Sequence, residues 1–160
     1  MSQNIINIFK NRGYSYIKTE TNIIFMKNKD DIILIFINDS ILSINNIKDY
    51  IKISINLEIN HIIIIYKQKI TPSTKKIILN TKITIETFEE RECFDITKHK
   101  YYYPHIKVDD NIKNELLSKY GNSLPIILKS DPVVKLFNFK KGDILKILRK
   151  DNNIFYRIVK

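Results

Sequence analysis

Short runs of β-branched residues, separated by polar turns, dominate the first half of the chain. They cover residues 23–26, 31–37, 61–66 and 82–88 and consist largely of isoleucine. Side chains branched at Cβ favour extended backbone, so each run predicts a strand. The polar residues 27–30, between the first two runs, predict a hairpin.

A second period, with apolar residues every three or four positions, predicts helices between these runs. Isoleucine recurs at this spacing through residues 41–55, with Asp39 or Ser40 as the expected N-cap. Thr71 followed by Pro72 predicts another helix start, because proline is favoured at the first helical position. The order strand, helix, strand, helix, strand predicts an α/β layer with parallel pairing.

After a charged stretch the pattern changes, and we place a domain boundary at about residues 96–104. The elements predicted beyond it are a helix capped by Asp109 or Asp110 and ended by Gly121, a strand at 126–128, a helix starting at Ser130-Asp131-Pro132, and strands at 143–148 and 154–159 joined by the turn 151–153. The sequence thus predicts an α+β/α/β protein with an α/β domain at residues 1–95 and a small α+β domain at residues 96–160.

The charge is divided unevenly between the two predicted domains. The chain has 160 residues and a net charge of +10. Residues 1–95 hold 13 basic and 11 acidic side chains, a net charge of +2, whereas residues 96–160 hold 14 and 6, a net charge of +8. A basic domain of this kind is typical of contacts with phosphates or with an acidic protein surface.

Several classes of chemistry lack the residues they need. The three glycines are far apart, which excludes a glycine-rich phosphate loop. Cys93 is alone, and His61, His99 and His105 have no ligand at metal-site spacing, so we expect no metal, no cofactor and ordinary surface or packing histidines. The apolar runs are too short to cross a membrane.

A stand-alone basic nucleic-acid-binding or nuclease-like protein is the alternative function. A metal-dependent nuclease would place Asp31 beside a strand and a Glu-x-Lys motif on the next strand, but no such motif follows. The acidic residues Glu86, Glu89, Glu90 and Glu92 favour a solvated charged face instead. Residues 101–103, three tyrosines, are expected to alternate across a strand, although stacking on bases is a further possibility.

Lysines surround the predicted helix start at Thr71. No acidic residue lies between Glu58 and Glu86, and a helix N-terminus flanked by lysines suits a phosphate group. A capped helix with solvated lysines would look the same in sequence. The candidate DNA-proximal residues are Lys67, Lys69, Thr71, Pro72, Ser73, Thr74, Lys75 and Lys76.

The C-terminal tract resembles one family of RNA polymerase subunits. The matching elements are Leu124-Pro125, Ser130-Asp131-Pro132, Lys140-Lys141-Gly142, Ile147-Leu148-Arg149 and Tyr156-Arg157-Ile158-Val159. They resemble the assembly domain of the fifth subunit shared by eukaryotic nuclear RNA polymerases, a domain that makes up essentially the whole of the archaeal counterpart. Upstream, Thr71-Pro72-Ser73-Thr74 resembles a loop of the eukaryotic jaw domain. Two positions depart from the family pattern, since Ile126 stands in place of a basic residue and Asn138 in place of a glycine.

This resemblance implies a non-catalytic subunit without active-site residues of its own. Its N-terminal domain would be an inactive, restriction-endonuclease-like jaw near downstream double-stranded DNA. Its C-terminal domain would dock on the largest polymerase subunit and neighbouring small subunits, without homo-oligomer formation or membrane contact. The implied docking residues are Pro104, His105, Leu124, Pro125, Ser130, Asp131, Pro132, Lys141, Gly142, Arg149, Tyr156 and Arg157.

The resemblance also implies a place of action at the site of transcription. That place would be the nucleus for a cellular protein, and the host cytoplasm or the virion for a viral one. The richness in isoleucine, lysine and asparagine suggests an A+T-rich gene, as in some large DNA viruses and parasites.

Overall fold

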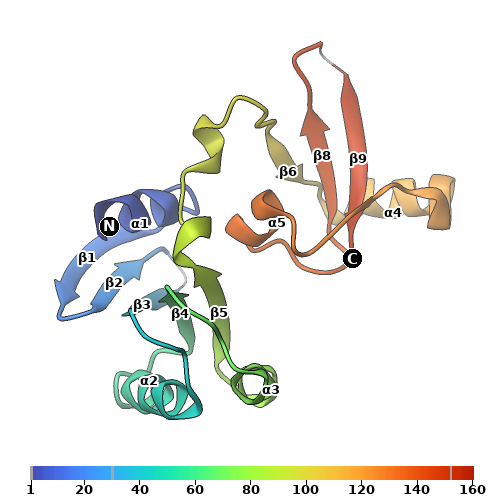
Figure 1. The fold of residues 1–160 in the computed structure, drawn as a ribbon. Coiled ribbons are helices and arrows are strands. Elements are labelled where there is room, and N and C mark those ends of the chain that lie inside the picture. Colours follow the sequence, from blue (N-terminus) through green and yellow to red (C-terminus); the bar gives the residue numbers. More distant parts are fainter. Residues whose placement is uncertain (1, 30, 152) are drawn as a thin grey trace. The chain divides into compact units, whose positions relative to one another are not determined.

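The computed structural model describes residues 2–29, 31–151 and 153–160. The chain divides into two compact units, Met1–Phe94 and Asp95–Lys160 (Figure 1). The turns expected at 27–30 and 151–153 include Asp30 and Asn152, which lie outside the described residues. Across the described ranges, no helix is both long and apolar enough to cross a membrane.

The described residues of the N-terminal unit form a five-stranded mixed sheet. Its strands are β1 (Ser15–Glu20), β2 (Ile23–Lys27), β3 (Ile32–Asn38), β4 (His61–Tyr66) and β5 (Thr84–Glu89), in that spatial order. Neighbours from β1 to β3 are antiparallel, whereas β3, β4 and β5 are parallel. The predicted hairpin and the predicted parallel pairing are therefore confirmed.

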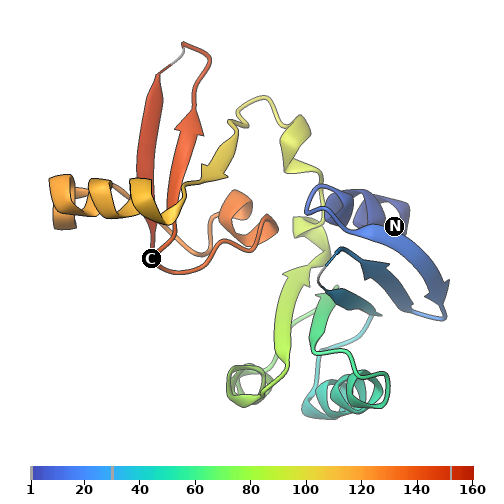
Figure 2. The same cartoon turned by 180° about the vertical axis from the view of Figure 1, so that it is seen from behind.

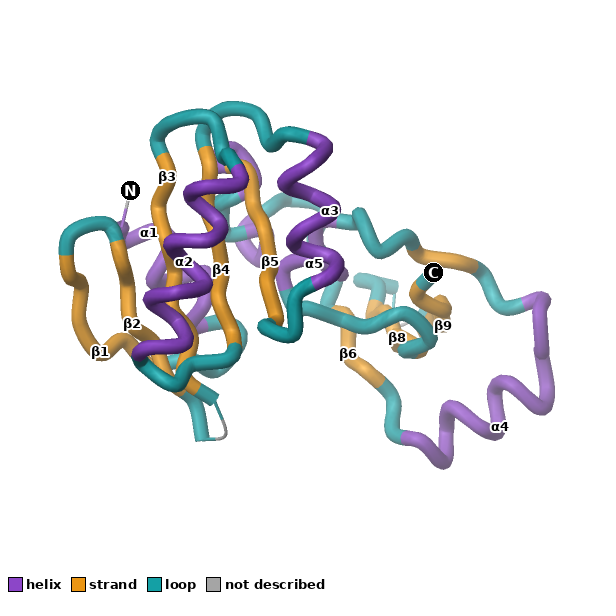
Figure 3. Tube along the Cα trace, turned by 90° about the horizontal axis from the view of Figure 1, so that it is seen from below, coloured by secondary structure: helices purple, strands orange, loops and turns teal. Residues whose placement is uncertain are grey.

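Helices cover both faces of this sheet. The helices α2 (Ile44–Asn56) and α3 (Pro72–Asn80) are the crossovers between parallel strands and lie on the same face (Figure 3). The opening helix α1 (Ser2–Lys10) lies on the opposite face, where the rings of Phe9 and Phe88 meet edge to face at 6.0 Å. Because β3 and β4 are covered on both sides, they can be almost entirely apolar.

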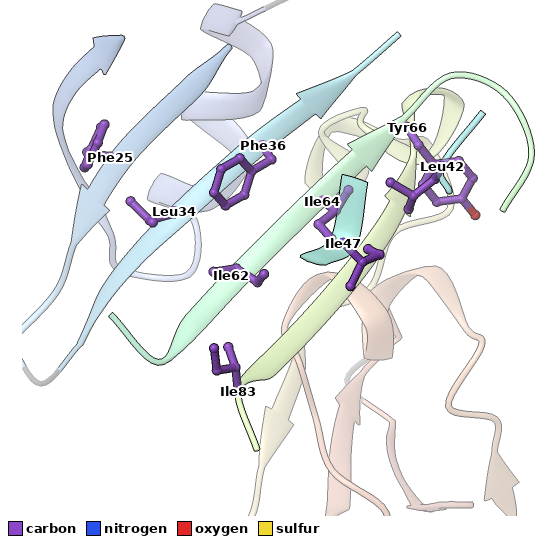
Figure 4. Close-up of a cluster of buried hydrophobic side chains, with 9 residues drawn as sticks. All are labelled: Phe25, Leu34, Phe36, Leu42, Ile47, Ile62, Ile64, Tyr66 and Ile83. Atoms are coloured by element: carbon purple, nitrogen blue, oxygen red, sulfur yellow. The ribbon is translucent and has the colours of Figure 1, made fainter. Parts of the chain in front are cut away.

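One buried hydrophobic cluster of this unit lies between the sheet and the two crossover helices. Phe25, Leu34, Ile62 and Ile64 project from neighbouring strands towards Ile47 of α2 (Figure 4). All but Phe25 are fully buried. Burial of one such aliphatic side chain stabilises a fold by roughly 1.5–3 kcal/mol, so this cluster is a major source of stability.

The start of α2 differs from the prediction. Ser43 is the N-cap, not Asp39 or Ser40, and it forms a capping box with Asn46. Two residues earlier, Ile41 is outside the helix and half exposed. The shift arises because Leu42 pairs with Ile70 in an isolated parallel bridge, which keeps the backbone extended up to Ser43.

The described residues of the C-terminal unit form a smaller four-stranded sheet. The order is β6 (His105–Lys107), β8 (Ile144–Leu148), β9 (Ile154–Val159) and β7 (Ile126–Ile127). The long hairpin of β8 and β9, drawn in orange to red, is seen from behind in Figure 2. The helix α4 (Asp110–Tyr120) packs through Leu116 against one face, and α5 (Pro132–Leu136) packs through Val134 against the other. Short 3₁₀ helices occur at Glu90–Glu92, Ile96–Lys98 and Gly121–Ser123.

Two strands and one loop depart from the sequence pattern. The predictions contain neither β1, whose residues are all exposed, nor the three-residue β6. The strand expected across residues 101–103 is wrong, because β6 begins only at His105 and Tyr101 is 68% exposed. Proline at position 104 lacks the N–H group that would extend the ladder.

Candidate functional site

The candidate DNA contact lies in the segment that joins β4 to α3. The Thr71 hydroxyl accepts a hydrogen bond of 3.2 Å from the Thr74 backbone N–H, which caps the helix. Thr74 is fully buried, and its hydroxyl donates to the Leu42 carbonyl at 3.3 Å. Both threonines therefore shape the turn, while Pro72 and Ser73 are exposed at its tip.

The lysines of this segment are all exposed. Lys67 is held by the Asp39 carboxylate at 2.7 Å, and this hydrogen bond raises the pKa of Lys67. No ion pair is recorded for Lys69, Lys75 or Lys76 within the described part of the chain. These three cations are thus available to a polyanion.

A buried ionic cluster on the α1 face of the sheet was not predicted. We call it the His61 cluster, and it consists of Arg12, Tyr14, Asp31, His61 and Glu86. The Arg12 guanidinium donates to both Glu86 oxygens, at 3.0 and 2.9 Å. The two ring nitrogens of His61 lie 2.7 Å from Asp31 and 2.7 Å from Glu86. The Tyr14 hydroxyl completes the cluster with a 3.3 Å hydrogen bond to Asp31.

Proximity of opposite charges shifts the pKa values in this cluster. Burial by itself would lower the pKa of His61, but hydrogen bonds to Glu86 and Asp31 outweigh it and raise the pKa. Burial would raise the pKa of Glu86, yet His61 and Arg12 hold it below the ordinary value. Burial and Asp31 raise the pKa of Tyr14 to about 12. The shifts of His61 and Glu86 both favour the charged form of the side chain, as expected for an ionic network.

The His61 cluster corrects two expectations. Glu86 does not belong to a solvated charged face, because its side chain is only 13% exposed and is bound by Arg12. His61 is neither a surface nor a simple packing residue but bridges two carboxylates. The cluster draws its charged side chains from four separate segments, which contain Arg12, Asp31, His61 and Glu86. No local sequence motif therefore predicts it.

The same contacts bear on the nuclease alternative. Asp31 does lie near another carboxylate, but His61 stands between Asp31 and Glu86. Arg12 engages both oxygens of Glu86. Within the described ranges, no group of three or more His, Cys, Asp or Glu side chains is arranged to hold a metal ion. The carboxylates here serve a salt-bridge network.

The expected docking residues of the C-terminal unit fall into two groups. Those with structural roles are Leu124, which is buried in the core, Asp131, which caps α5, and Gly142, which adopts a φ of +89° in the turn before β8. The remainder are at least partly accessible and are Pro104, His105, Pro125, Ser130, Pro132, Lys141, Arg149, Tyr156 and Arg157. This accessible group is dispersed along the sequence and includes the cations Lys141, Arg149 and Arg157.

Some of these accessible side chains are already oriented by neighbours. The Arg149 guanidinium lies over the ring of Phe155 at 4.4 Å and 5.9 Å from the ring of Tyr103. Arg157 donates a 3.2 Å hydrogen bond to the Ile126 carbonyl, and His105 Nδ1 lies 2.6 Å from the Tyr103 carbonyl. Held in this way, Arg149 and Phe155 have less side-chain entropy to lose when a partner binds.

Sequence reasoning missed the apolar side chains of this surface. Ile106 is 50% exposed, Ile154 47% and Phe155 41%, all on strands of the small sheet. No local signal marks them, because an apolar residue on a strand looks the same in sequence whether the face it lies on is covered or exposed. Exposed aromatic and branched residues beside arginine are common where protein interfaces form.

The two departures from the family pattern have different structural settings. Asn138 has a φ of +54°, a left-handed conformation that favours glycine and that asparagine tolerates better than most residues. Replacement of a glycine by asparagine at this position thus keeps the backbone path. Ile126 is 46% exposed on β7, where a basic side chain would reach solvent.

Comparison with known proteins finds one matching family model and relatives among RNA polymerase subunits. Residues 94–159 match the family model described as RNA polymerase Rpb5, C-terminal domain. The chain is 31% identical over 147 residues to "DNA-directed RNA polymerases I, II, and III subunit rpabc1" of Dictyostelium discoideum, which covers 84% of this chain and 75% of that protein. It is 40% identical over 77 residues to "DNA-directed RNA polymerase subunit 5-like protein 1" of Arabidopsis thaliana, covering 46% of this chain and 37% of that protein.

The first of these matches is longer than either structural unit, so it includes parts of both. The family model, in contrast, falls almost wholly within the C-terminal unit. The residues of the C-terminal motifs, 124–159, all lie within the part that the family model matches. The chain belongs to the family of the shared RNA polymerase subunit 5, Rpb5.

Proposed function

We propose that the chain is a non-catalytic structural subunit of a multisubunit DNA-directed RNA polymerase. The observation that carries this proposal is the similarity to a shared polymerase subunit over 147 residues, which includes parts of both units. In this proposal residues 96–160 form an assembly domain that docks on the largest subunit beside neighbouring small subunits. Residues 1–95 form a jaw domain, restriction-endonuclease-like in fold, near downstream DNA.

Charge and exposure support the docking role of the C-terminal domain. Its net charge of +8 suits an acidic partner surface, and Lys141 and Arg149 are exposed. The stacked Arg149 and Phe155 provide the kind of rigid aromatic and arginine pair that dominates binding energy at interfaces. Docking through this domain leaves the N-terminal domain for another task.

Co-purification tests the docking proposal. Tagged full-length chain is expected to recover the large polymerase subunits, and changing Lys141 and Arg149 to Glu should lower that recovery by about tenfold or more. The matched control changes two exposed α2 lysines, Lys48 and Lys52, to Glu. Recovery of the unmodified chain without any large subunit would contradict the proposal.

The exposed lysines after β4 support a contact between the jaw domain and downstream DNA. Pro72 and Ser73 are exposed at the start of α3, and Lys75 and Lys76 lie on its first turns. Such a contact would be to phosphates and therefore independent of base sequence. The candidate DNA-proximal residues between Lys67 and Lys76 would position the duplex without recognising its base sequence.

Salt dependence tests this DNA contact. Changing Lys75 and Lys76 to Glu should weaken retention of DNA at low salt and reduce the slope of log K against log salt concentration by about 2, while polymerase assembly survives. The Lys48 and Lys52 reversal is again the control. Equal retention by the Lys75 and Lys76 variant would remove the DNA contact and leave the polymerase role intact.

The place of action follows from the same proposal. A polymerase subunit works at the site of transcription, which is the nucleus for a cellular protein and the host cytoplasm or virion for a viral one. The composition, rich in isoleucine, lysine and asparagine, is what an A+T-rich gene would produce. Fractionation of the source cells with an antibody against the chain distinguishes these places.

A further inference from the structure

A groove of about 770 Å³ lies at the carboxyl ends of β4 and β5 in the N-terminal unit. Its wall includes Tyr66 at the end of β4, Lys69 in the following segment and Glu89 at the end of β5. Carboxyl ends of parallel strands are where α/β sheets commonly hold ligands. The size lies within the range of pockets that accommodate small ligands or a few side chains.

The floor of the groove contains a buried donor without a protein partner. Tyr66 is only 7% exposed, and among the described residues nothing forms a hydrogen bond with its hydroxyl. All described side-chain polar atoms that are fully inaccessible do have partners, so this hydroxyl retains some accessible surface, and Tyr66 is one of the residues that line the groove. Figure 4 shows the hydroxyl oxygen at the tip of the ring that points away from Ile62 and Ile64.

The hydroxyl remains a donor over the physiological range. Burial raises the pKa of Tyr66, and the nearby carboxylates of Glu89 and Glu92 raise it further. A protonated tyrosine hydroxyl can donate to a carboxylate oxygen, and hydrogen bonds to charged acceptors are the stronger kind. The Tyr66 hydroxyl can therefore donate a hydrogen bond to an anionic oxygen of a ligand.

The cations that line the groove are of two kinds. Lys67 is paired with Asp39, and Arg91 is paired with Glu89. Lys69 and Lys75 line the groove as well, and neither has a recorded ion pair with any described residue. Two positive charges and one hydroxyl donor thus remain available to one ligand.

The groove also offers an apolar contact. Ile41 is 52% exposed and lines the groove together with the half-buried Ile70. The bridge between Leu42 and Ile70 holds these segments together. A DNA backbone presents no branched apolar group to Ile41. Because Glu89 and Glu90 also line the groove, a single carboxylate held at Tyr66, Lys69 and Lys75 suits it better than the successive phosphates of a DNA backbone.

We propose that this groove binds an extended protein segment in which a carboxylate side chain lies next to a branched or aromatic apolar side chain. The carboxylate meets the Tyr66 hydroxyl, Lys69 and Lys75, and the apolar side chain packs on Ile41 and Ile70. This interaction goes beyond the proposed polymerase role. The groove shares Lys67, Lys69 and Lys75 with the candidate DNA-proximal residues, but Tyr66 is not one of those residues and Lys76 does not line the groove, so Tyr66 and Lys76 distinguish the two contacts.

Fluorescence anisotropy of the full chain with defined probes tests the proposal. The probes are a labelled octapeptide that alternates glutamate with leucine, the same peptide with glutamine in place of glutamate, and a short DNA duplex. The glutamate peptide should bind about fivefold or more tightly than the glutamine peptide, because only the former brings a charged acceptor. Equal binding of the two peptides would overturn the proposal.

Two single variants separate the groove from the DNA contact. Tyr66→Phe removes one oxygen atom that has no protein partner, so the fold should persist while the glutamate peptide binds about fivefold more weakly. DNA binding by this variant should be unchanged. Lys76→Glu should do the opposite, weakening DNA and sparing the peptide.

Other patterns contradict the groove proposal without touching the polymerase role. If Tyr66→Phe keeps its unfolding midpoint and binds the glutamate peptide as tightly as the unmodified chain, the hydroxyl has no ligand role. If Tyr66→Phe weakens DNA and the duplex displaces the peptide, the groove belongs to the DNA contact. Failure of the DNA prediction alone, seen with Lys76→Glu, leaves the peptide site standing.

Discussion

The two units of this protein differ in how deeply they bury the ion pairs that join distant segments. In the N-terminal unit, Arg12 bridges to Glu86 across 74 positions with side chains only 5% and 13% exposed, and His61 links Glu86 to Asp31. In the C-terminal unit, the carboxylates of Asp109 and Asp131 accept hydrogen bonds from backbone N–H groups two or three residues away, and the long-range pair of Lys107 with Asp143 has a lysine that is 54% exposed.

This difference separates tertiary from local stabilisation. Side-chain bridges between distant segments connect the residues after α1 and before β3 to the strands β4 and β5. Caps and turns instead fix the ends of single elements, each worth about 0.5–2 kcal/mol. We therefore expect single substitutions to have larger effects in the N-terminal cluster and smaller, local effects in the C-terminal unit.

The strongest test of this contrast is the variant Glu86→Gln. It keeps the shape of the side chain but removes the negative charge that Arg12 and His61 share. Loss of one partner from a buried ion pair leaves an uncompensated charge, so the N-terminal unit should lose about 3 kcal/mol of unfolding free energy. Amide hydrogen exchange in β4 and β5 measures this loss unit by unit.

The control for that prediction is Glu20→Gln. Glu20 pairs with Lys18 at 2.5 Å, but both side chains are more than half exposed. Exposed pairs contribute less than about 1 kcal/mol, so the control should change little. Equal losses from the two variants would mean that the His61 cluster is no stronger than a surface pair.

The next effect is the pH dependence of the N-terminal unit. His61 has a raised pKa when folded, so its stabilising contribution is complete below the ordinary value of 6.5 and is lost as pH rises through the folded value. Glu86 has a lowered pKa, so its contribution is complete above the ordinary value of 4.5 and is lost as pH falls through the folded value. Stability from the cluster should peak between these two ordinary values.

Denaturant unfolding between pH 4 and pH 9 measures this profile. One titrating proton changes the unfolding free energy by at most about 1.4 kcal/mol per pH unit. The decline of the unfolding free energy with rising pH that is due to His61 cannot be steeper than this. His61→Gln should remove the decline above pH 6.5, because the variant has no imidazole at this position to lose a proton. A decline of the same steepness in the variant would assign it to another group.

The contrast between the units also explains what the sequence could reveal. Helix caps are local signals: the cap of α4, predicted at Asp109 or Asp110, is Asp109, and the helix start predicted at Ser130-Asp131-Pro132 has Asp131 as its cap. The His61 cluster depends on register between strands that are far apart in sequence, which no local pattern encodes. The cap of α2 was misplaced for the same reason, since the pairing of Leu42 with Ile70 is a long-range contact.

A smaller effect is expected from Asp131→Ala in the C-terminal unit. Asp131 Oδ1 accepts hydrogen bonds from the N–H groups of Val133 at 2.8 Å and Val134 at 3.4 Å. Loss of this cap should cost about 1–2 kcal/mol, read from hydrogen exchange in β8 and β9. Asp110→Ala, at the exposed first residue of α4, is the matched control and should cost less than about 0.5 kcal/mol. A loss above about 3 kcal/mol for Asp131→Ala would mean that this cap acts beyond its own helix.

The smallest expected effect lies at Asn138, immediately after α5. Its φ of +54° is costly for most side chains, while asparagine adopts it more readily and glycine without strain. Asn138→Ala should therefore destabilise the C-terminal unit by about 0.5–1 kcal/mol, whereas Asn138→Gly should change it by less than about 0.5 kcal/mol, because relief of strain is offset by greater freedom of the unfolded chain. Thermal unfolding of both variants measures the difference. If alanine were tolerated as well as glycine, the left-handed turn would not constrain this position, and the replacement of the family's glycine by asparagine would have no conformational explanation.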